Sequence, residues 1–304
     1  MTGRVVRRSC GSGLRPRIIE VRGRRPLPQA ERLVQTALLC ALLTGQAVAA
    51  EFVAPFVPSP QEDVETMLEL AAVGPGDYLI DLGSGDGRIV ITAALRGAMG
   101  HGVELDRELV ALAERRARDA EVGDRVSFVQ GDVFDADIGA ATVVTLYLMP
   151  EVNLRLRPKL LAELRPGTRV VSNSFDMGEW TPDRHVPGRA SGGMMLWIVP
   201  ASVDGSWRFD AGGEALRAEI SQRFQQIEVT LERGDEPLHV LEASLTGERL
   251  TLLAGDGQRR YAFSGRVEGG AVEGLVQVHD AADSRVRRWH GRRVAQERAP
   301  AESS

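Results

Sequence analysis

A predicted strand followed by three closely spaced glycines constrains this chain more than any other feature of its sequence. Residues 78–82 are apolar apart from one acid, which predicts a strand buried on both faces of a parallel sheet. Gly83, Gly85 and Gly87 follow at every second position, and residues 88–95 resume with helical spacing. A strand, a glycine turn and a helix start give the geometry in which a backbone approaches a nucleotide closely. We therefore expect a nucleotide-type ligand at this turn.

The spacing of the glycines narrows the kind of nucleotide. Turns that bind dinucleotides follow the pattern G-x-G-x-x-G and direct a helix N-terminus at a pyrophosphate. This chain has G-x-G-x-G instead, with Asp81 two residues before the first glycine. An anion facing the turn repels phosphate but suits a ligand that carries an ammonium and a sulfonium. The pattern therefore weakens one alternative, a nicotinamide-dependent oxidoreductase.

Two further acids stand at the ends of the next two predicted strands. Glu104 ends residues 102–104, about twenty residues after the turn, where a carboxylate accepts hydrogen bonds from ribose hydroxyls. Asp132 follows the strand predicted over residues 126–129. The alternative is that both acids are ordinary helix caps. Three acids at three successive strand ends favour a ligand site.

The order of predicted elements indicates the fold class. Strands and helices alternate to residue 200, which predicts an α/β domain with a Rossmann-like, doubly wound, mostly parallel sheet. Residues 194–200 are expected to close that sheet as an antiparallel edge strand. From residue 201 the pattern changes to short alternating runs separated by glycine-containing pairs, which predicts a small antiparallel all-β domain, either a sandwich or a barrel.

The first fifty residues differ from the rest. Residues 1–32 are arginine-rich, and residues 33–50 carry no charge and end on Ala-Val-Ala-Ala. This is typical of a secretory signal, and its apolar part is too short to span a bilayer comfortably. We expect an exported protein, periplasmic or envelope-associated, with no stable membrane span in its mature chain. The alternative is a basic tail and a docked helix in a cytoplasmic protein.

The composition argues against nucleic-acid binding, disulfides and a cysteine metal site. The chain is mildly acidic, with a formal net charge of -5, and shows no sign of a nucleic-acid-binding surface. Cys10 and Cys40 both lie in the signal-like segment, so no disulfide and no metal site is predicted for the mature protein. The expected organisation is a signal-like segment over residues 1–50, an α/β domain over residues 51–200 and a β-domain over residues 201–304.

Three stretches carry a family resemblance: DLGSGDGRIVITAA at residues 81–94, TLYLMPEVNLRLRPKLLAELRPGTRVVS at residues 145–172 and FDMGEW at residues 175–180. They resemble class I methyltransferases that use S-adenosylmethionine (SAM). They are similar also to mitochondrial protein-lysine methyltransferases that share DLGSGDGR and an upstream FVP-type segment. The resemblance covers about residues 52–200, and it implies SAM as cofactor and protein lysine as acceptor. The implied cofactor-binding residues are Asp81, Gly83, Ser84, Gly85, Gly87, Glu104 and Asp132, with Asp132 facing the adenine amino group.

The candidates for substrate contact follow the fourth and fifth predicted strands, because open α/β sheets bind ligands at the carboxyl ends of their strands. They are Pro150, Asn153, Asp176 and Trp180. Tyr147 is the catalytic candidate, since it can orient an amine or remove its proton, but a strand aromatic can equally be part of the core. The extended segment over residues 52–60 is a candidate cover for the cofactor.

Two hypotheses of different classes follow. The leading one is a SAM-dependent methyltransferase with a C-terminal β-domain. The other is an exported binding protein that keeps the Rossmann-like fold but has lost catalysis, since the predicted signal implies export whereas SAM is made in the cytosol. The intact glycines and acids argue against that loss.

Overall fold

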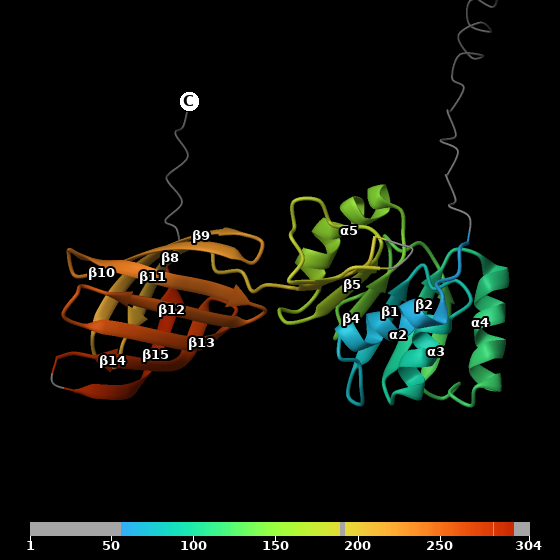
Figure 1. Cartoon of the computed structure of the whole chain (residues 1–304), viewed down its shortest axis with the longest axis horizontal. Helices are drawn as coiled ribbons and strands as arrows, with labels where there is room; N and C mark the ends of the chain where they lie inside the picture. The colour runs from blue at the N-terminus through green and yellow to red at the C-terminus, as the bar shows by residue number, and fades with distance from the viewer. Residues whose placement is uncertain (1–55, 189–191, 282, 295–304) are drawn as a thin grey trace, which may run out of the picture. The chain divides into compact units, whose positions relative to one another are not determined.

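The computed structural model describes residues 56–188, 192–281 and 283–294 (Figure 1). The signal-like segment predicted over residues 1–50 lies outside the described residues. Among the helices that the structure describes, none combines the length and the hydrophobicity needed to cross a membrane.

Residues 61–198 form an α/β domain built on one seven-stranded sheet. Its helices are α2 (Gln61–Leu70), α3 (Arg88–Leu95), α4 (Arg107–Asp119) and α5 (Pro150–Glu163). Its strands are β1 (Tyr78–Leu82), β2 (Met99–Glu104), β3 (Val126–Gln130), β4 (Val143–Leu146), β5 (Arg169–Asn173), β6 (Arg184–Val186) and β7 (Met194–Ile198). The strand order is β3-β2-β1-β4-β5-β7-β6, and the first five are mutually parallel. The predicted Rossmann-like, mostly parallel sheet is confirmed.

One detail of the sheet differs from the prediction. Strand β7 is antiparallel to β5, as expected, but it is not the edge strand. Strand β6 pairs with its other side and forms the edge. With three residues, β6 is too short and too polar to be identified as a strand from the sequence. Strand β7 is apolar, and four of its five residues are buried.

Both faces of the sheet are covered, as the apolar sequence of β1 predicts. Helices α2, α3 and α4 pack on one face, and the fully buried Leu79 of β1 belongs to that cluster. Helix α5 packs on the other face, and the next residue of β1, Ile80, belongs to the second cluster. Because successive side chains of a strand point to opposite faces, this assignment also shows to which face of the sheet each side chain of β1, β4 and β5 points.

The C-terminal part folds as a closed antiparallel barrel, which decides between the sandwich and the barrel. Its strands are β8 (Gly205–Asp210), β9 (Ala215–Arg223), β10 (Gln226–Arg233), β11 (Glu236–Thr246), β12 (Arg249–Gly255), β13 (Arg260–Glu268), β14 (Ala271–His279) and β15 (Ser284–Arg293). Each strand pairs with the next, and β15 pairs with β8 to close the ring. Buried and exposed residues alternate along β9 and β13, as barrel strands require.

Aromatic side chains fill the barrel interior. Phe209 lies at its centre, with its ring centroid 5.1 Å from that of Trp289 and 6.3 Å from those of Trp207 and Phe263. Offset and edge-on contacts at these distances add to the free energy gained from burying the rings. The interior is therefore a packed core.

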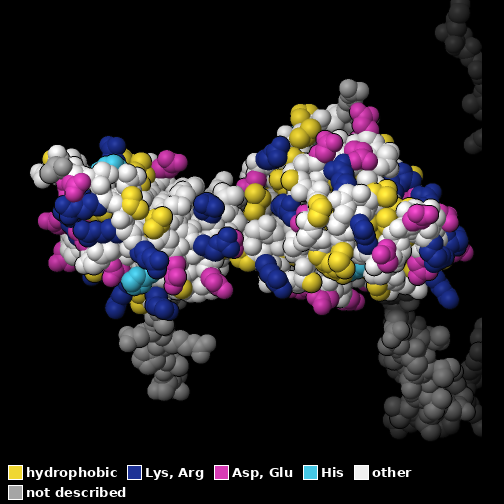
Figure 2. Space-filling model, turned by 90° about the horizontal axis from the view of Figure 1, so that it is seen from below, with side chains coloured by type: hydrophobic (Ala, Val, Ile, Leu, Met, Phe, Trp, Pro, Cys, Tyr) yellow, Lys and Arg dark blue, Asp and Glu magenta, His cyan; other side chains and the backbone are white. Residues whose placement is uncertain are grey.

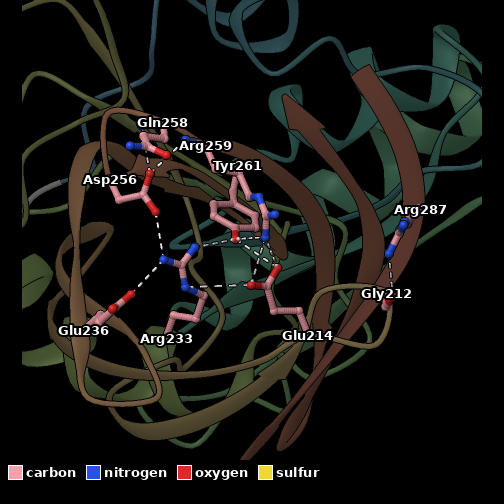
Figure 3. Close-up of polar contacts among 9 residues, drawn as sticks. All are labelled: Gly212, Glu214, Arg233, Glu236, Asp256, Gln258, Arg259, Tyr261 and Arg287. Atoms are coloured by element: carbon pink, nitrogen blue, oxygen red, sulfur yellow. Dashed lines mark hydrogen bonds and ion pairs between the residues drawn. The ribbon is translucent and has the colours of Figure 1, made fainter. Parts of the chain in front are cut away.

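A polar network lies at one end of the barrel and links the ends of three hairpins (Figure 3). The Tyr261 hydroxyl, on a fully buried residue, donates to Glu214 Oε2 at 2.9 Å. Arg259 also pairs with Glu214, at 3.2 Å, and Arg233 pairs with Asp256 at 2.8 Å. Because each buried polar group here has a partner, the network closes this end of the barrel without leaving an unsatisfied charge.

Acidic and basic side chains are interspersed on the molecular face drawn in Figure 2. The mixture of charges indicates a solvated surface on that face. One exposed ion pair of the chain joins Arg266 and Glu248, whose charged groups lie 3.0 Å apart. Exposed pairs of this kind contribute little stability each, because water screens them.

Candidate active site

The glycine turn leads from the carboxyl end of β1 into α3. Gly83, Gly85 and Gly87 have φ of 81°, 53° and 79°, in the left-handed region that favours glycine. The backbone amides of Gly83 and Ser84 both donate to the carbonyl of Val103, at 2.8 and 3.0 Å, which ties the turn to β2. The backbone of the turn is therefore held in place by its neighbour strand.

Side chains lie directly against all three of these glycines, as Gly83 and Gly85 illustrate. A Cβ on Gly83 would lie 2.6 Å from Leu148 Cδ2, and a Cβ on Gly85 would lie 2.2 Å from the ring of Phe56. Phe56 belongs to the described part of the extended segment before α2, and its ring lies over the glycine turn. Only glycine leaves room for these close approaches, and the sequence pattern at the turn has this physical cause.

Asp86 holds the turn to its surroundings through two arginines. Its carboxylate pairs with Arg88 at 2.6 Å and also with Arg116 of α4. Arg88 in addition donates to the carbonyl of Ser59, which ties down the segment that carries Phe56. Burial acts to raise the pKa of Asp86, but the hydrogen bonds and charge of Arg88, together with the charge of Arg116, outweigh it and lower the pKa. Asp86 therefore stays ionised in a structural role.

Asp81 is, like Asp86, a buried acid of the site. It is 2% exposed and accepts a hydrogen bond from Thr145 Oγ1 at 2.7 Å. Burial raises its pKa to about 7, the charges of Glu104 and Asp86 act in the same direction, and the Thr145 hydrogen bond opposes them. A cationic ligand above the turn would favour the ionised form of this carboxyl.

Glu104 and Asp132 complete the row of acids along the carboxyl edge of the sheet, since β1, β2 and β3 are neighbours. Glu104 Oε2 accepts from the amide of Gly85 at 2.8 Å, so it contacts the glycine turn directly. It does not cap α4, because Asp106 does so by accepting from the amide of Glu108 at 2.7 Å. Asp132 accepts from the amide of Phe134 at 2.9 Å in a turn, and no helix follows until α5. The helix-cap alternative is therefore wrong for both acids.

These groups fit a SAM-type ligand. The left-handed glycines give a close backbone approach, and the row of carboxylates suits hydroxyls, an amino group and positive charge. The hydroxyl of Ser84 is buried within the turn and has no hydrogen-bond partner among the described residues. A buried polar atom of this kind is a position where a ligand or a water supplies the missing partner.

The predicted substrate-facing residues divide into two groups. Pro150, the first residue of α5, is half-buried, and Asp176 is exposed and accepts from the amide of Gly178 at 2.9 Å. Asn153 and Trp180 do not lie at the surface. Asn153 is fully buried and donates to Ser172 Oγ at 3.1 Å, and the fully buried Trp180 packs 5.9 Å from another tryptophan ring.

The position of Asn153 and Trp180 corrects the prediction that they face substrate. Asn153 also donates to the carbonyl of Phe175 at 3.2 Å, so it fastens α5 to the end of β5. A bridge between Met177 and Trp180 folds the loop after β5 back on itself, and both side chains enter the core. This fold-back depends on contacts between elements, which the loop sequence alone does not indicate.

Tyr147 lies where the sequence predicts, directly after β4, and its side chain is half-buried. Three residues near this edge of the sheet were not named individually from the sequence: Phe56, although its segment was predicted to cover the cofactor, Thr145, which bonds Asp81, and Asn173, which ends β5. Each had a weak signal: an aromatic residue in the extended segment, a hydroxyl in an otherwise apolar strand, and a polar residue closing the fifth strand. The pattern gave no reason to connect them with one another.

Comparison with known proteins gives consistent results. The sequence model of the ANTKMT methyltransferase domain matches residues 81–184. A protein-lysine N-methyltransferase of Saccharolobus islandicus (strain REY15A) is 46% identical over 132 residues, covering 42% of this chain and 81% of that relative. A lysine N-methyltransferase of Homo sapiens that is named for a component of ATP synthase is 32% identical over 195 residues, covering 60% of this chain and 78% of that relative. A solved RNA methyltransferase from Salinibacter ruber, in complex with S-adenosyl-L-homocysteine, shares 54% identity over 48% of this chain and 96% of its own, with a TM-score of 0.47.

Proposed function

Because the chain belongs to the class I SAM-dependent methyltransferases, we propose that it methylates the side-chain amine of a lysine in a polypeptide. The observation that carries this proposal is the similarity to lysine N-methyltransferases from Saccharolobus islandicus and Homo sapiens, at 46% and 32% identity. A relative from Mus musculus named for the adenine nucleotide translocase, at 35% identity over 162 residues, is also a lysine N-methyltransferase. As a class I SAM-dependent methyltransferase the chain is an enzyme, which further weakens the alternative of a nicotinamide-dependent oxidoreductase.

SAM is the cofactor, and when bound it supplies an activated methyl group on a sulfonium. Gly83, Ser84 and Gly85 would receive it closely over the turn, and Glu104 would accept hydrogen bonds from the ribose. Asp132 would face the adenine amino group. Asp81 places a carboxyl under the turn, where ionisation is favoured by a nearby positive charge.

The remaining task of the protein is to align an amine with the bound methyl group. Alignment alone can supply a large part of the acceleration, because the methyl group is already activated. The amine must also be neutral to attack, which a desolvated site or a nearby proton acceptor assists. Tyr147 is half-buried at the end of β4, next to the switch point of the sheet between β1 and β4, and is the candidate for this contact.

A transfer assay with methyl-labelled SAM tests the proposal. Purified chain is incubated with lysine-containing polypeptides from its native host, and mass spectrometry locates each added methyl group. We expect the modification on lysine side chains, and its loss when the modified lysine is replaced by arginine. Glu104→Ala serves as the cofactor-site control and should abolish labelling. Label found in RNA, or on side chains other than lysine, would contradict the proposed acceptor while leaving the cofactor assignment intact.

A further inference from the structure

Asn173, the last residue of β5, carries a buried polar atom for which the described residues supply no hydrogen-bond partner. The residue is 1% exposed, and its Nδ2 has no hydrogen-bond partner in the described structure. The other end of its carboxamide is occupied, because Oδ1 accepts from the Ser174 hydroxyl at 2.8 Å. A buried polar atom without a partner destabilises the free protein, and its presence therefore requires an explanation.

The register of the sheet places this carboxamide beside Tyr147. Strands β4 and β5 are parallel and pair from Val143 with Arg169 to Leu146 with Ser172. One further residue along both chains puts Tyr147 opposite Asn173. Neighbours in this direction lie about 4.8 Å apart, so the two side chains are within reach of one ligand.

Side-chain alternation shows that both residues point to the face of the sheet that carries the glycine turn. Val143 and Val171 belong to the cluster under α2, α3 and α4. Positions two residues further along each strand share that face, and Thr145 accordingly contacts Asp81 there. Tyr147 and Asn173 therefore extend the polar row that Asp81 and Thr145 begin.

The backbone around Asn173 is fixed in an uncommon conformation. Ser174 has φ of 69°, a left-handed value that is unusual for serine, and its amide donates to the carbonyl of Gly193 at 2.8 Å. The chain just before β7 approaches so closely that a Cβ on Gly192 would lie 2.4 Å from the Ser174 carbonyl oxygen. Strained residues of this kind persist where the surrounding structure holds them, and they are concentrated at functional sites.

The position also fits the acceptor better than the cofactor. The carboxylates that suit ribose and adenine lie at the ends of β2 and β3, on one side of β1. Strands β4 and β5 lie on the other side of β1, across the switch point of the sheet. The carboxyl ends of these two strands remain for the molecule that receives the methyl group.

We propose that Asn173 is a positioning residue for the methyl acceptor, holding its amine beside Tyr147 through the end of the carboxamide that Ser174 leaves free. The Ser174 hydroxyl can donate or accept, so a half-turn of the carboxamide presents either its oxygen or its nitrogen to the ligand. The oxygen would accept a hydrogen bond from an N–H of the amine, so that the lone pair of the amine points away from Asn173. The inference rests on the proposed function in requiring an amine acceptor.

Asn173→Leu in the full chain tests this, because leucine has nearly the same shape and no polar atoms. We expect the melting temperature of the free protein to rise by about 2–4 °C, since the variant removes an unpartnered buried group. The affinity for S-adenosylhomocysteine, measured by calorimetry, should stay within about twofold. With a lysine polypeptide, kcat/KM should fall about tenfold, the loss expected for one hydrogen bond. Asn173→Asp keeps an acceptor oxygen and should retain more activity than the leucine variant.

Ser172→Ala is the matched control. Ser172 is the neighbouring buried polar residue, but it points to the opposite face and bonds Asn153. We expect this change to lower the melting temperature and to leave the KM for the polypeptide unchanged. Asn173 would have a structural role instead if Asn173→Leu lowered the melting temperature, and a cofactor role if it weakened S-adenosylhomocysteine binding tenfold. Either result overturns the inference.

The two proposals fail separately. If the wild-type chain methylates lysine and Asn173→Leu leaves kcat/KM unchanged, the role of Asn173 is wrong and the proposed function stands. If the wild-type chain methylates no lysine, the proposed function is wrong. The stability and calorimetric results still decide whether Asn173 is held ready for a ligand other than the cofactor.

Discussion

Replacing Asp81 by asparagine should stabilise the α/β domain in a way that depends on pH. The carboxyl is 2% exposed, and its burial raises its pKa from the ordinary value of 3.8 to about 7. Between these two values the folded chain keeps a proton that the unfolded chain has released, so the stability of the wild type falls as pH rises through this window and is constant above it. Asparagine resembles the protonated acid and can still accept the hydrogen bond of Thr145.

The magnitude follows from the size of the pKa change. At 1.36 kcal/mol for each pH unit, the difference between 3.8 and about 7 corresponds to about 4 kcal/mol at pH 8. At pH 4.5 the same linkage gives about 1 kcal/mol, because this pH lies less than one unit above the unfolded pKa of 3.8 and the folded chain still holds its proton. Asp81→Asn should therefore exceed the wild type in unfolding free energy by about 4 kcal/mol at pH 8 and by about 1 kcal/mol at pH 4.5.

Urea unfolding of both proteins at the two pH values measures these differences. Hydrogen-exchange labelling of the β1 segment reports on the α/β domain, and the barrel strands in the same samples give an internal reference. An equal difference in unfolding free energy between variant and wild type at pH 4.5 and pH 8 would refute the predicted pH dependence. The same result would show that Asp81 titrates as an exposed acid does.

Three further predictions concern the turn, the barrel and the N-terminus. Gly85→Ala should lower the unfolding free energy by about 1–2 kcal/mol, because φ is 53° there. Phe56→Ala in the same chain should recover part of this loss, because it removes the ring that the new Cβ meets. Urea titration of the single and double variants measures both effects. Tyr261→Phe should destabilise the barrel by about 1–3 kcal/mol in thermal unfolding, since Glu214 loses a buried partner, and an unchanged transition would contradict the role of the network in closing the barrel end. N-terminal sequencing of the protein from its native host should begin at residue 50 or 51, and a product in the cytosol that retains Met1 would contradict the predicted export.

Most of the fold could be predicted because its signals are local. The glycine turn, the apolar β1 and the alternation in the barrel strands each appear within ten or so residues, the range over which periodicity reports on secondary structure. The sequence predicts a helix over residues 154–164, whereas α5 begins at Pro150, so this difference is a boundary error within the same segment. The three acids could be placed together because parallel strands end at the same edge of a sheet.

The rest depends on contacts between elements. The sequence of the loop after β5 contains polar residues, but the bridge between Met177 and Trp180 draws both side chains inward. Asn153 looks available at the start of a helix, yet Ser172 and Phe175 hold it inside. Asn173 could not be selected from the pattern, since its significance arises from the register of β4 with β5.

The closed barrel restricts the ways in which that domain could recognise another chain. Its described strands are each paired on both sides, since β15 pairs with β8 and β9 with β10. An added strand needs a free edge, so main-chain strand addition to the barrel is limited to the parts of β10 and β11 beyond their three paired positions. Elsewhere a partner of the barrel would be selected through outward side chains and hairpin ends, whereas β3 and β6 are the edge strands of the α/β sheet.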